Sequence, residues 1–318
     1  MFRYERINYK IYILLLLLFI ALFIVGSFFD LNISNALYNN DSRFGLMFTV
    51  YGSLPLWFLL TICGVVLFKV SILDQRWHRK IYGSILGIIV FLFSVTLNVY
   101  CVFFMCPEIV KIFTMSFRIV LIVLFQSISV ICVWKLTDNN DRRYIRRNIL
   151  FMLRVIFSSM LLTLILSLIW KRPSFYLISN GLMVNGYYFP VESIFRDWYR
   201  IGSGISREIF PDAKTIDFMS FPSIAMTNAA TGMTLFYIPI INMKCKIYAR
   251  FSNTILLIGF LWSCFVGFSQ LLYGRAYLTD IAMGFLITII FMMLYTRIFL
   301  AMKKVKNNNA TINETKSI

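Results

Sequence analysis

Long apolar runs separated by short polar clusters dominate the sequence. The runs 11-IYILLLLLFIALFIVGSFF-29 and 279-TDIAMGFLITIIFMMLY-295 carry almost no charge. Each approaches the roughly 20 residues that an α-helix needs to cross the hydrocarbon core of a bilayer. The whole chain divides into eight such runs, at 12–29, 46–67, 81–105, 119–134, 150–170, 222–241, 251–272 and 277–295. The pattern therefore predicts an all-α, polytopic membrane helical bundle of about eight transmembrane helices.

Composition excludes a soluble protein. The chain is 59% hydrophobic and only 14% charged over 318 residues, whereas a soluble domain of this length needs far more polar surface to cover its core. The first run follows Arg3, Arg6 and Lys10, as the apolar part of a cleaved signal peptide would. However, it exceeds the usual length of about 7–15 residues, and no small-x-small cleavage site follows it. We interpret it as a retained first span.

The formal net charge of +17 would indicate a nucleic-acid partner in a soluble protein. Here the positive-inside rule explains the charge, because the basic clusters lie at every second loop and so fall on one side of the membrane. One side collects Arg3, Arg6, Lys10, Arg76, Arg79, Lys80, Lys135, Arg142, Arg143, Arg146, Arg147, Lys244, Lys246, Arg250, Arg297, Lys303, Lys304 and Lys306. We therefore expect a multi-pass protein of the cell membrane with both termini cytoplasmic, the loop 171–221 facing outward, and no nucleic-acid partner.

Domain organisation follows from the same pattern. Residues 1–303 are expected to form one membrane domain, and the polar stretch 304–318 a disordered cytoplasmic tail. The six cysteines show no paired spacing, so neither a disulfide framework nor a metal site is predicted. They are Cys63, Cys101, Cys106, Cys132, Cys245 and Cys264. No metal or other cofactor is expected.

Three polar segments at outer span ends are the candidates for chemistry. They are 170-WKRPSFY-176, 220-SFPSIAMTNAA-230 and 267-GFSQLLYGRAYLTDIAMG-284. Taken singly, Lys171 and Arg172 also fit cations that snorkel to the interface. A Pro-Ser pair also fits an ordinary helix start, with serine as the cap and proline in the first turn. Asp280 is harder to explain in this way, because an intramembrane carboxylate usually has a partner, for which Arg275 or Arg172 would serve.

Together, the order, side and spacing of these segments resemble the type 2 phosphatidic acid phosphatase (lipid phosphate phosphatase) superfamily. That family carries Lys-x6-Arg-Pro, then Pro-Ser-Gly-His, then Ser-Arg-x5-His-x3-Asp. The resemblance implies a six-helix core of spans one, two and five to eight, with 81–134 as an additional hairpin. It also implies that cations anchor a phosphate, that the third-motif histidine attacks phosphorus, and that the second-motif histidine protonates the leaving group.

This sequence departs from the family motifs at the positions that carry the chemistry. The positions that match are Arg172, Pro173, Pro222, Ser223, Ser269 and Asp280. The positions that differ are Ile165 for lysine, Ile224 for glycine, Gln270 for arginine, and Ala225 and Ala276 for the two histidines. The single histidine of the chain, His78, belongs to a cytoplasmic loop and cannot replace them. Because three further positions have changed besides the histidines, natural divergence explains the losses better than a deliberate knock-out.

Three functional hypotheses follow. The leading one is a non-catalytic membrane protein whose partners are membrane lipids, including lipid phosphates. Its remnant site would consist of Arg172, Ser223, Lys171 and Arg275, with Asp280 as the orienting carboxylate. That site either binds an anionic lipid headgroup or is a leftover of helix packing. The alternative is an active phosphatase acting on phosphatidic acid or prenyl diphosphates, with Asp280 or Ser223 as nucleophile. The third is a transporter or scramblase, for which broken helices meeting at mid-membrane would argue.

Overall fold

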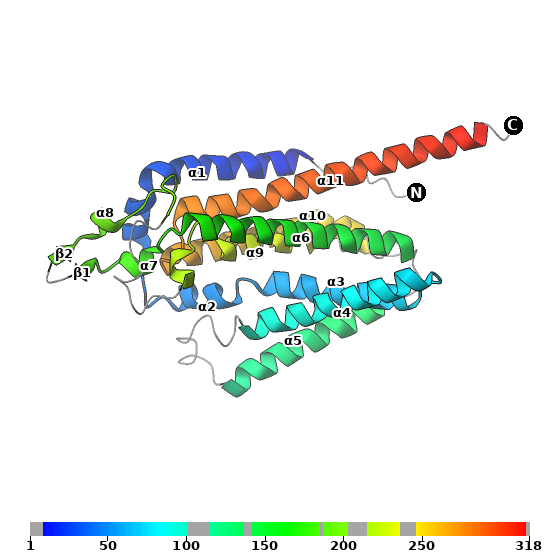
Figure 1. The fold of residues 1–318 in the computed structure, drawn as a ribbon, viewed down its shortest axis with the longest axis horizontal. Helices are drawn as coiled ribbons and strands as arrows, with labels where there is room; N and C mark the ends of the chain where they lie inside the picture. Colours follow the sequence, from blue (N-terminus) through cyan, green and yellow to red (C-terminus); the bar gives the residue numbers. More distant parts are fainter. Residues whose placement is uncertain are drawn as a thin grey trace.

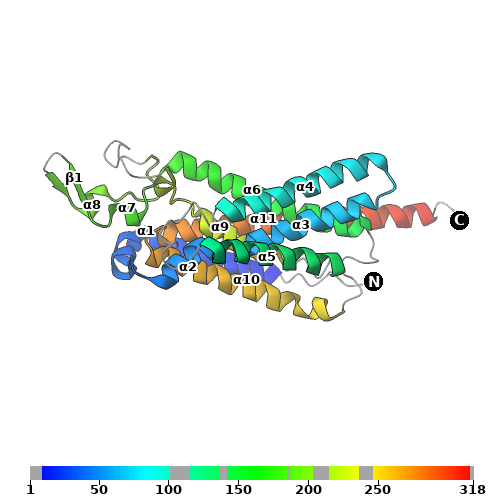
Figure 2. The same ribbon diagram turned by 90° about the horizontal axis from the view of Figure 1, so that it is seen from below.

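The computed structural model describes residues 9–100, 115–136, 142–184, 187–202, 215–235 and 246–315. Its long helices lie side by side along one axis and form a bundle (Figures 1 and 2). α1 begins and α11 ends at one end of this bundle, which we call the terminal end. The segments that follow α6 gather at the opposite end, which we call the loop end.

Nine helices of eight residues or more make up the described part of the bundle. They are α1 (Tyr9–Leu37), α2 (Arg43–Tyr51), α3 (Leu54–Ile72), α4 (Trp77–Tyr100), α5 (Met115–Leu136), α6 (Arg142–Trp170), α9 (Ile224–Thr231), α10 (Lys246–Leu272) and α11 (Leu278–Thr315). The loop end adds the short helices α7 (Phe175–Ile178) and α8 (Val191–Ile194), a 3₁₀ turn at Thr215–Phe218, and the strands β1 (Leu182–Val184) and β2 (Tyr187–Phe189). The strands pair antiparallel, with Met183 opposite Tyr188.

Six of the predicted spans are confirmed as helices long and apolar enough to cross a membrane. In the described residues these are Lys10–Leu37, Arg43–Ile72, Trp77–Tyr100, Ile145–Ile178, Thr254–Leu272 and Leu278–Ile298. The chain is thus a polytopic, helical membrane protein. The end of the predicted span 81–105 lies outside the described residues.

The other two predicted spans are not among these six in the described residues. α5 covers the predicted span 119–134 with a helix of 22 residues, within which Ile122–Ile131 forms a shorter apolar stretch. α9 has eight residues and is followed by a 3₁₀ turn; the rest of the predicted span 222–241 lies outside the described residues. Its threonines explain the early end, because Thr231 and Thr234 bond backbone carbonyls three residues before them.

The C-terminal stretch also differs from the prediction. The polar residues after 303 were expected to be disordered, but α11 continues through them as far as Thr315. Figure 1 shows this part of α11 extending beyond the terminal end of the other helices. The sequence contains no proline or glycine after Gly284 that would stop the helix.

α3 lies at the centre of the core, and the additional hairpin packs against it. The span that contains α3 is the most buried of the six. Gly64 of α3 and Gly87 of α4 face each other so closely that a Cβ on Gly87 would lie 2.7 Å from the Phe68 nitrogen and 2.8 Å from the Gly64 oxygen. The Thr61 hydroxyl shares a hydrogen bond with the Ser94 hydroxyl and contacts Gln126 Oε1 at hydrogen-bond distance, which joins α3 to α4 and α5. Small residues and shared polar groups are a common means of holding helices together in lipid.

This close crossing gives a stability prediction. Gly87→Leu should lower the free energy of unfolding by about 1–3 kcal/mol, because the new side chain meets backbone atoms that cannot move independently. The measurement is the thermal unfolding midpoint of the protein in detergent. Ile88→Leu is the matched control, since Ile88 is 45% exposed on the bundle surface. Equal midpoints for the two variants would contradict the crossing.

Candidate functional site

The end of α6 turns Arg172 into the interior of the loop end. α6 ends at Trp170, and Lys171 adopts a left-handed backbone with φ of +48°. This conformation is unfavourable for a residue other than glycine and often ends a helix. The Lys171 side chain is exposed, whereas Arg172 is only 1% exposed. The side chains of these two adjacent residues therefore point in opposite directions, Lys171 toward the surface and Arg172 into the protein.

Arg172 binds two carboxylates and two further oxygen acceptors. Its Nη1 donates to Asp280 Oδ1 at 2.5 Å and to Thr279 Oγ1 at 2.9 Å. Its Nη2 donates to Asp30 Oδ2 at 3.0 Å, and its Nε donates to the Arg196 carbonyl at 2.7 Å. The guanidinium also lies 4.0 Å from the centroid of the Tyr277 ring, as in a cation–π contact. All three nitrogens are therefore engaged by the protein itself.

Asp30 and Asp280 come from helices that pack side by side. Asp30 lies in the last third of α1, and its Oδ1 accepts the Thr279 backbone N–H at 3.0 Å. The Thr279 hydroxyl donates to Asp30 Oδ2. Gly26, one turn earlier in α1, permits this approach, because a Cβ there would lie 2.9 Å from the Thr279 nitrogen. Asp280 Oδ2 accepts the Tyr277 N–H at 2.8 Å, which caps the start of α11.

The start of α9 touches the same cluster through its backbone. The Ser223 N–H donates to the Asp280 carbonyl at 2.9 Å. The Ser223 hydroxyl acts as the N-cap of α9 and accepts the Met226 N–H. The Ser223 side chain thus has the role expected for an ordinary helix start, in which serine is the cap.

Arg275 belongs to a second, separate ion pair. Its Nη1 lies 2.6 Å from Asp217 Oδ1, and its guanidinium lies 4.8 Å from the Tyr176 ring centroid. The loop backbone joins this pair to the Arg172 region. The Ser174 N–H donates to the Asp217 carbonyl, and Ser220 donates to the Arg172 carbonyl through both its N–H and its hydroxyl. The described parts of the loop 171–221 are therefore bonded to the end of α6 and to the segment before α11.

The predicted site residues are brought together only in part. Arg172, Ser223 and Asp280 meet, and Arg172 rather than Arg275 is the partner of Asp280. Lys171 is exposed, and Ile165, at the position of the family lysine, is 45% exposed. Ala276 is buried and Ala225 is partly buried. The methyl side chain of alanine supplies no reactive group at either histidine position.

Sequence reasoning missed Asp30, Asp217, Tyr277 and Thr279. The predicted first span ends at residue 29, just before Asp30, but α1 continues seven residues beyond Asp30, to Leu37. A signal was available: Asp30 is a lone carboxylate directly after a long apolar run, and such a group usually has a buried partner.

The cluster is a buried ion-pair network and does not offer an open anion site. One guanidinium faces two carboxylates, with exposures of 1%, 5% and 0% for Arg172, Asp30 and Asp280. Removing one member of a buried ion pair leaves an uncompensated charge, which is strongly unfavourable. A phosphate arriving at Arg172 would have to displace a carboxylate and would be repelled by the other one.

Comparison with protein-family models, curated proteins and solved structures gave no match.

The ion-pair network around Arg172 predicts how much stability each of several variants should lose. Arg172→Met should lower the free energy of unfolding by about 3–5 kcal/mol, because it leaves two buried carboxylates without a cation. Asp30→Asn and Asp280→Asn should each lower the free energy of unfolding by less, since Arg172 keeps one carboxylate partner. The triple variant R172M/D30N/D280N should recover part of the loss.

Lys171→Met is the matched control, because it removes the neighbouring exposed cation. Thermal unfolding midpoints in detergent measure all five proteins. A K171M variant as unstable as R172M, or a triple variant less stable than R172M, would show that Arg172 does not hold the loop end together.

Proposed function

We propose that this protein is a non-catalytic membrane protein with a lipid-phosphatase-like framework, in which the former substrate end has become a structural junction. The observation that carries the proposal is the binding of Arg172 to Asp30 and Asp280. In the resembled family the corresponding arginine holds phosphate. Here the same side chain joins α1, the end of α6 and the start of α11.

The contacts of the remaining polar groups favour a non-catalytic role over an active phosphatase. Asp280 uses one oxygen for Arg172 and the other for the Tyr277 N–H, which keeps both from attacking a phosphorus atom. The Ser223 oxygen accepts an α9 backbone N–H. A nucleophile also needs a base within hydrogen-bond reach and an oriented acid for the leaving group. Alanine occupies both family histidine positions.

Membrane lipids remain the proposed partners, but the loop end contributes little affinity for an anionic headgroup. Arg172 and Arg275 are each paired with a protein carboxylate. Lys171 is exposed and acts only as a single cation near the surface. A single basic residue near an anionic surface contributes on the order of 1 kcal/mol, which is too little for a specific site.

The arrangement of the two ends supports the proposed orientation. α1 begins and α11 ends at the terminal end, together with the basic turn after α3 and the basic start of α6 (Figure 1). The outer loop covers the opposite end. With the positive-inside rule, this favours cytoplasmic termini and an outward-facing junction.

A transport role has one structural argument, the interruption between α2 and α3. The chain breaks at Gly52 and Ser53, and Asn228 of the short helix α9 donates to Ser53. However, protein side chains fill this break. The Trp262 indole donates to the Gly52 carbonyl at 2.8 Å, and Pro55 lies against Gly232. Protein groups thus pack against this helix break and bond its Gly52 carbonyl, so an ordinary kink explains it without a transported ion.

The test is phosphate release by the purified protein in detergent, with phosphatidic acid and a prenyl diphosphate as substrates. We expect release no faster than from a D280N variant or from heat-inactivated protein. Release that D280N or Ser223→Ala abolishes would overturn the proposal and establish a phosphatase with an unusual nucleophile. Ala225→Ser, at a family histidine position, is the control for nonspecific effects of substitution at this end.

A further inference from the structure

A basic cavity lies at the terminal end, far from the junction just described. It has a volume of about 540 Å³ and lies between the turn that joins α3 to α4 and the first three turns of α6. Its lining residues are Leu73, Asp74, Gln75, Arg76, Arg79, Arg146, Arg147 and Leu150. Sites for small ligands typically measure about 300–1,000 Å³, so this cavity is large enough to hold a headgroup.

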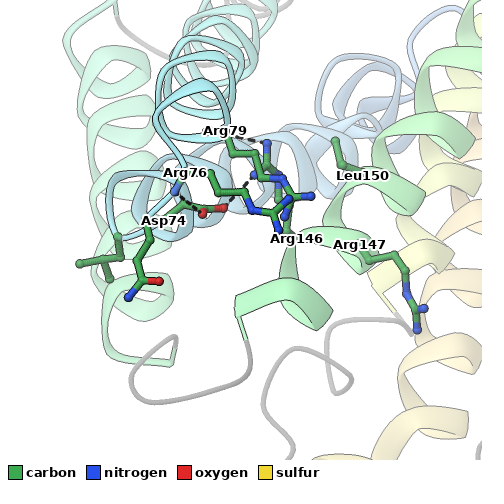
Figure 3. A pocket seen from close by; sticks show the side chains of 8 residues that line it. Asp74, Arg76, Arg79, Arg146, Arg147 and Leu150 are labelled. Carbon is green, nitrogen blue, oxygen red and sulfur yellow. Dashed lines mark hydrogen bonds and ion pairs between the residues drawn. The ribbon is translucent and has the colours of Figure 1, made fainter. Parts of the chain in front are cut away.

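One carboxylate organises the arginines around the cavity. Asp74 Oδ2 lies 3.2 Å from Arg146 Nη1, and Asp74 Oδ1 accepts the Arg76 N–H at 3.1 Å. Arg146 Nη2 also donates to the Arg79 carbonyl at 3.5 Å. Figure 3 shows Arg76, Arg79 and Arg146 gathered beside Asp74, whereas Arg147 lies apart from them. These contacts hold the turn against α6 and keep Arg76, Arg79 and Arg146 close together.

The charges at this cavity are not balanced as they are at the loop end. Among the described residues, four arginines and one carboxylate line it. The backbone N–H of Arg76 and the positive charges of Arg146, Arg79 and Arg76 lower the pKa of Asp74 from its usual value. Asp74 therefore stays ionised and binds Arg146. Arg76 and Arg79 are exposed, in contrast to the buried and saturated Arg172.

The positive-inside rule accounts for basic residues at this end, but not for their arrangement. It requires only that lysine and arginine occur near the span ends, in any direction. Here the cations come from two separate parts of the chain, the α3–α4 segment and α6, and all are arginines. Arginine presents a planar fork of donors that matches the oxygens of a phosphate. Lys80, next to Arg79 in the chain, does not line the cavity.

Residues typical of a membrane interface lie beside the cavity in the sequence. Trp77 and Tyr82, at the start of α4, are 68% and 70% exposed, as expected for the aromatic belt at a membrane interface. Leu73 and Leu150 contribute apolar surface to the lining. A ligand with a phosphate head and an apolar tail would match both parts of this surface.

We propose that this cavity binds the phosphate group of an anionic lipid from the membrane leaflet at the terminal end, through Arg76, Arg79, Arg146 and Arg147. Basic pockets between transmembrane helices bind such headgroups in other membrane proteins. The site is independent of the phosphatase-like loop end. Asp74 positions Arg146, and the α3–α4 turn supplies the two exposed arginines.

The experiment measures binding to the full-length protein in detergent, with short-chain phosphatidic acid and glycerol phosphate as separate probes. The variant Arg76→Gln/Arg79→Gln removes two exposed cations and should weaken binding of phosphatidic acid about tenfold or more. The matched control Lys10→Gln/Lys80→Gln removes the same charge from exposed positions at the same end, outside the cavity. It should leave the affinity unchanged.

A second variant tests the cavity without changing its charge. Leu150→Trp fills the hollow and should weaken phosphatidic acid binding, provided that its thermal unfolding midpoint shows a folded protein. Equal binding of glycerol phosphate would support a phosphate site that does not require a lipid tail. Equal losses for the arginine variant and its lysine control, no phosphatidic acid binding, or full binding by a folded L150W protein would overturn the proposal.

Discussion

The loop end depends on one constraint, the need to pair a guanidinium that is buried in the protein. A cation removed from water is tolerated only if charged and polar partners replace its hydration. Arg172 obtains them from α1, from α11 and from the outer loop, through Asp30, Asp280 and the Arg196 carbonyl. Three segments far apart in the sequence are thereby held at a single point, and the start of α9 joins them through the Asp280 backbone.

The same requirement explains how a site with a phosphatase-like sequence can be chemically closed. A catalytic phosphate site keeps its cations available to the substrate and to the transition state. In this protein two carboxylates occupy that place, and a second pair, Arg275 with Asp217, holds the covering loop. At the terminal end, by contrast, the described lining of the cavity contains four arginines and the carboxylate Asp74. The two ends thus differ in exposure: Arg172 is buried between two carboxylates, whereas Arg76 and Arg79 are exposed.

Apolar run length predicted the all-α fold and about eight spans, of which six are confirmed in the described residues, because lipid imposes a strong and local requirement on each helix. The predicted span 222–241 is described only as far as residue 235; there α9 ends at Thr231, and threonine hydroxyls bond nearby backbone carbonyls. Sequence spacing brought Arg172, Ser223 and Asp280 together correctly. It did not reveal Asp30 as a partner, because that contact spans 142 positions and depends on how α1 packs. It also could not show that Lys171 faces outward, which is decided by one left-handed backbone angle.

The saturation of Arg172 can be measured most directly by arginine modification with phenylglyoxal in intact membranes, followed by mass spectrometry of the peptides. Arg200, which is 55% exposed at the same end, serves as the internal reference. The account predicts rapid labelling of Arg200 and very slow labelling of Arg172, with no effect of added phosphate on either rate. Labelling of Arg172 as fast as that of Arg200, and protection of Arg172 by phosphate, would show an open anion site and contradict the account.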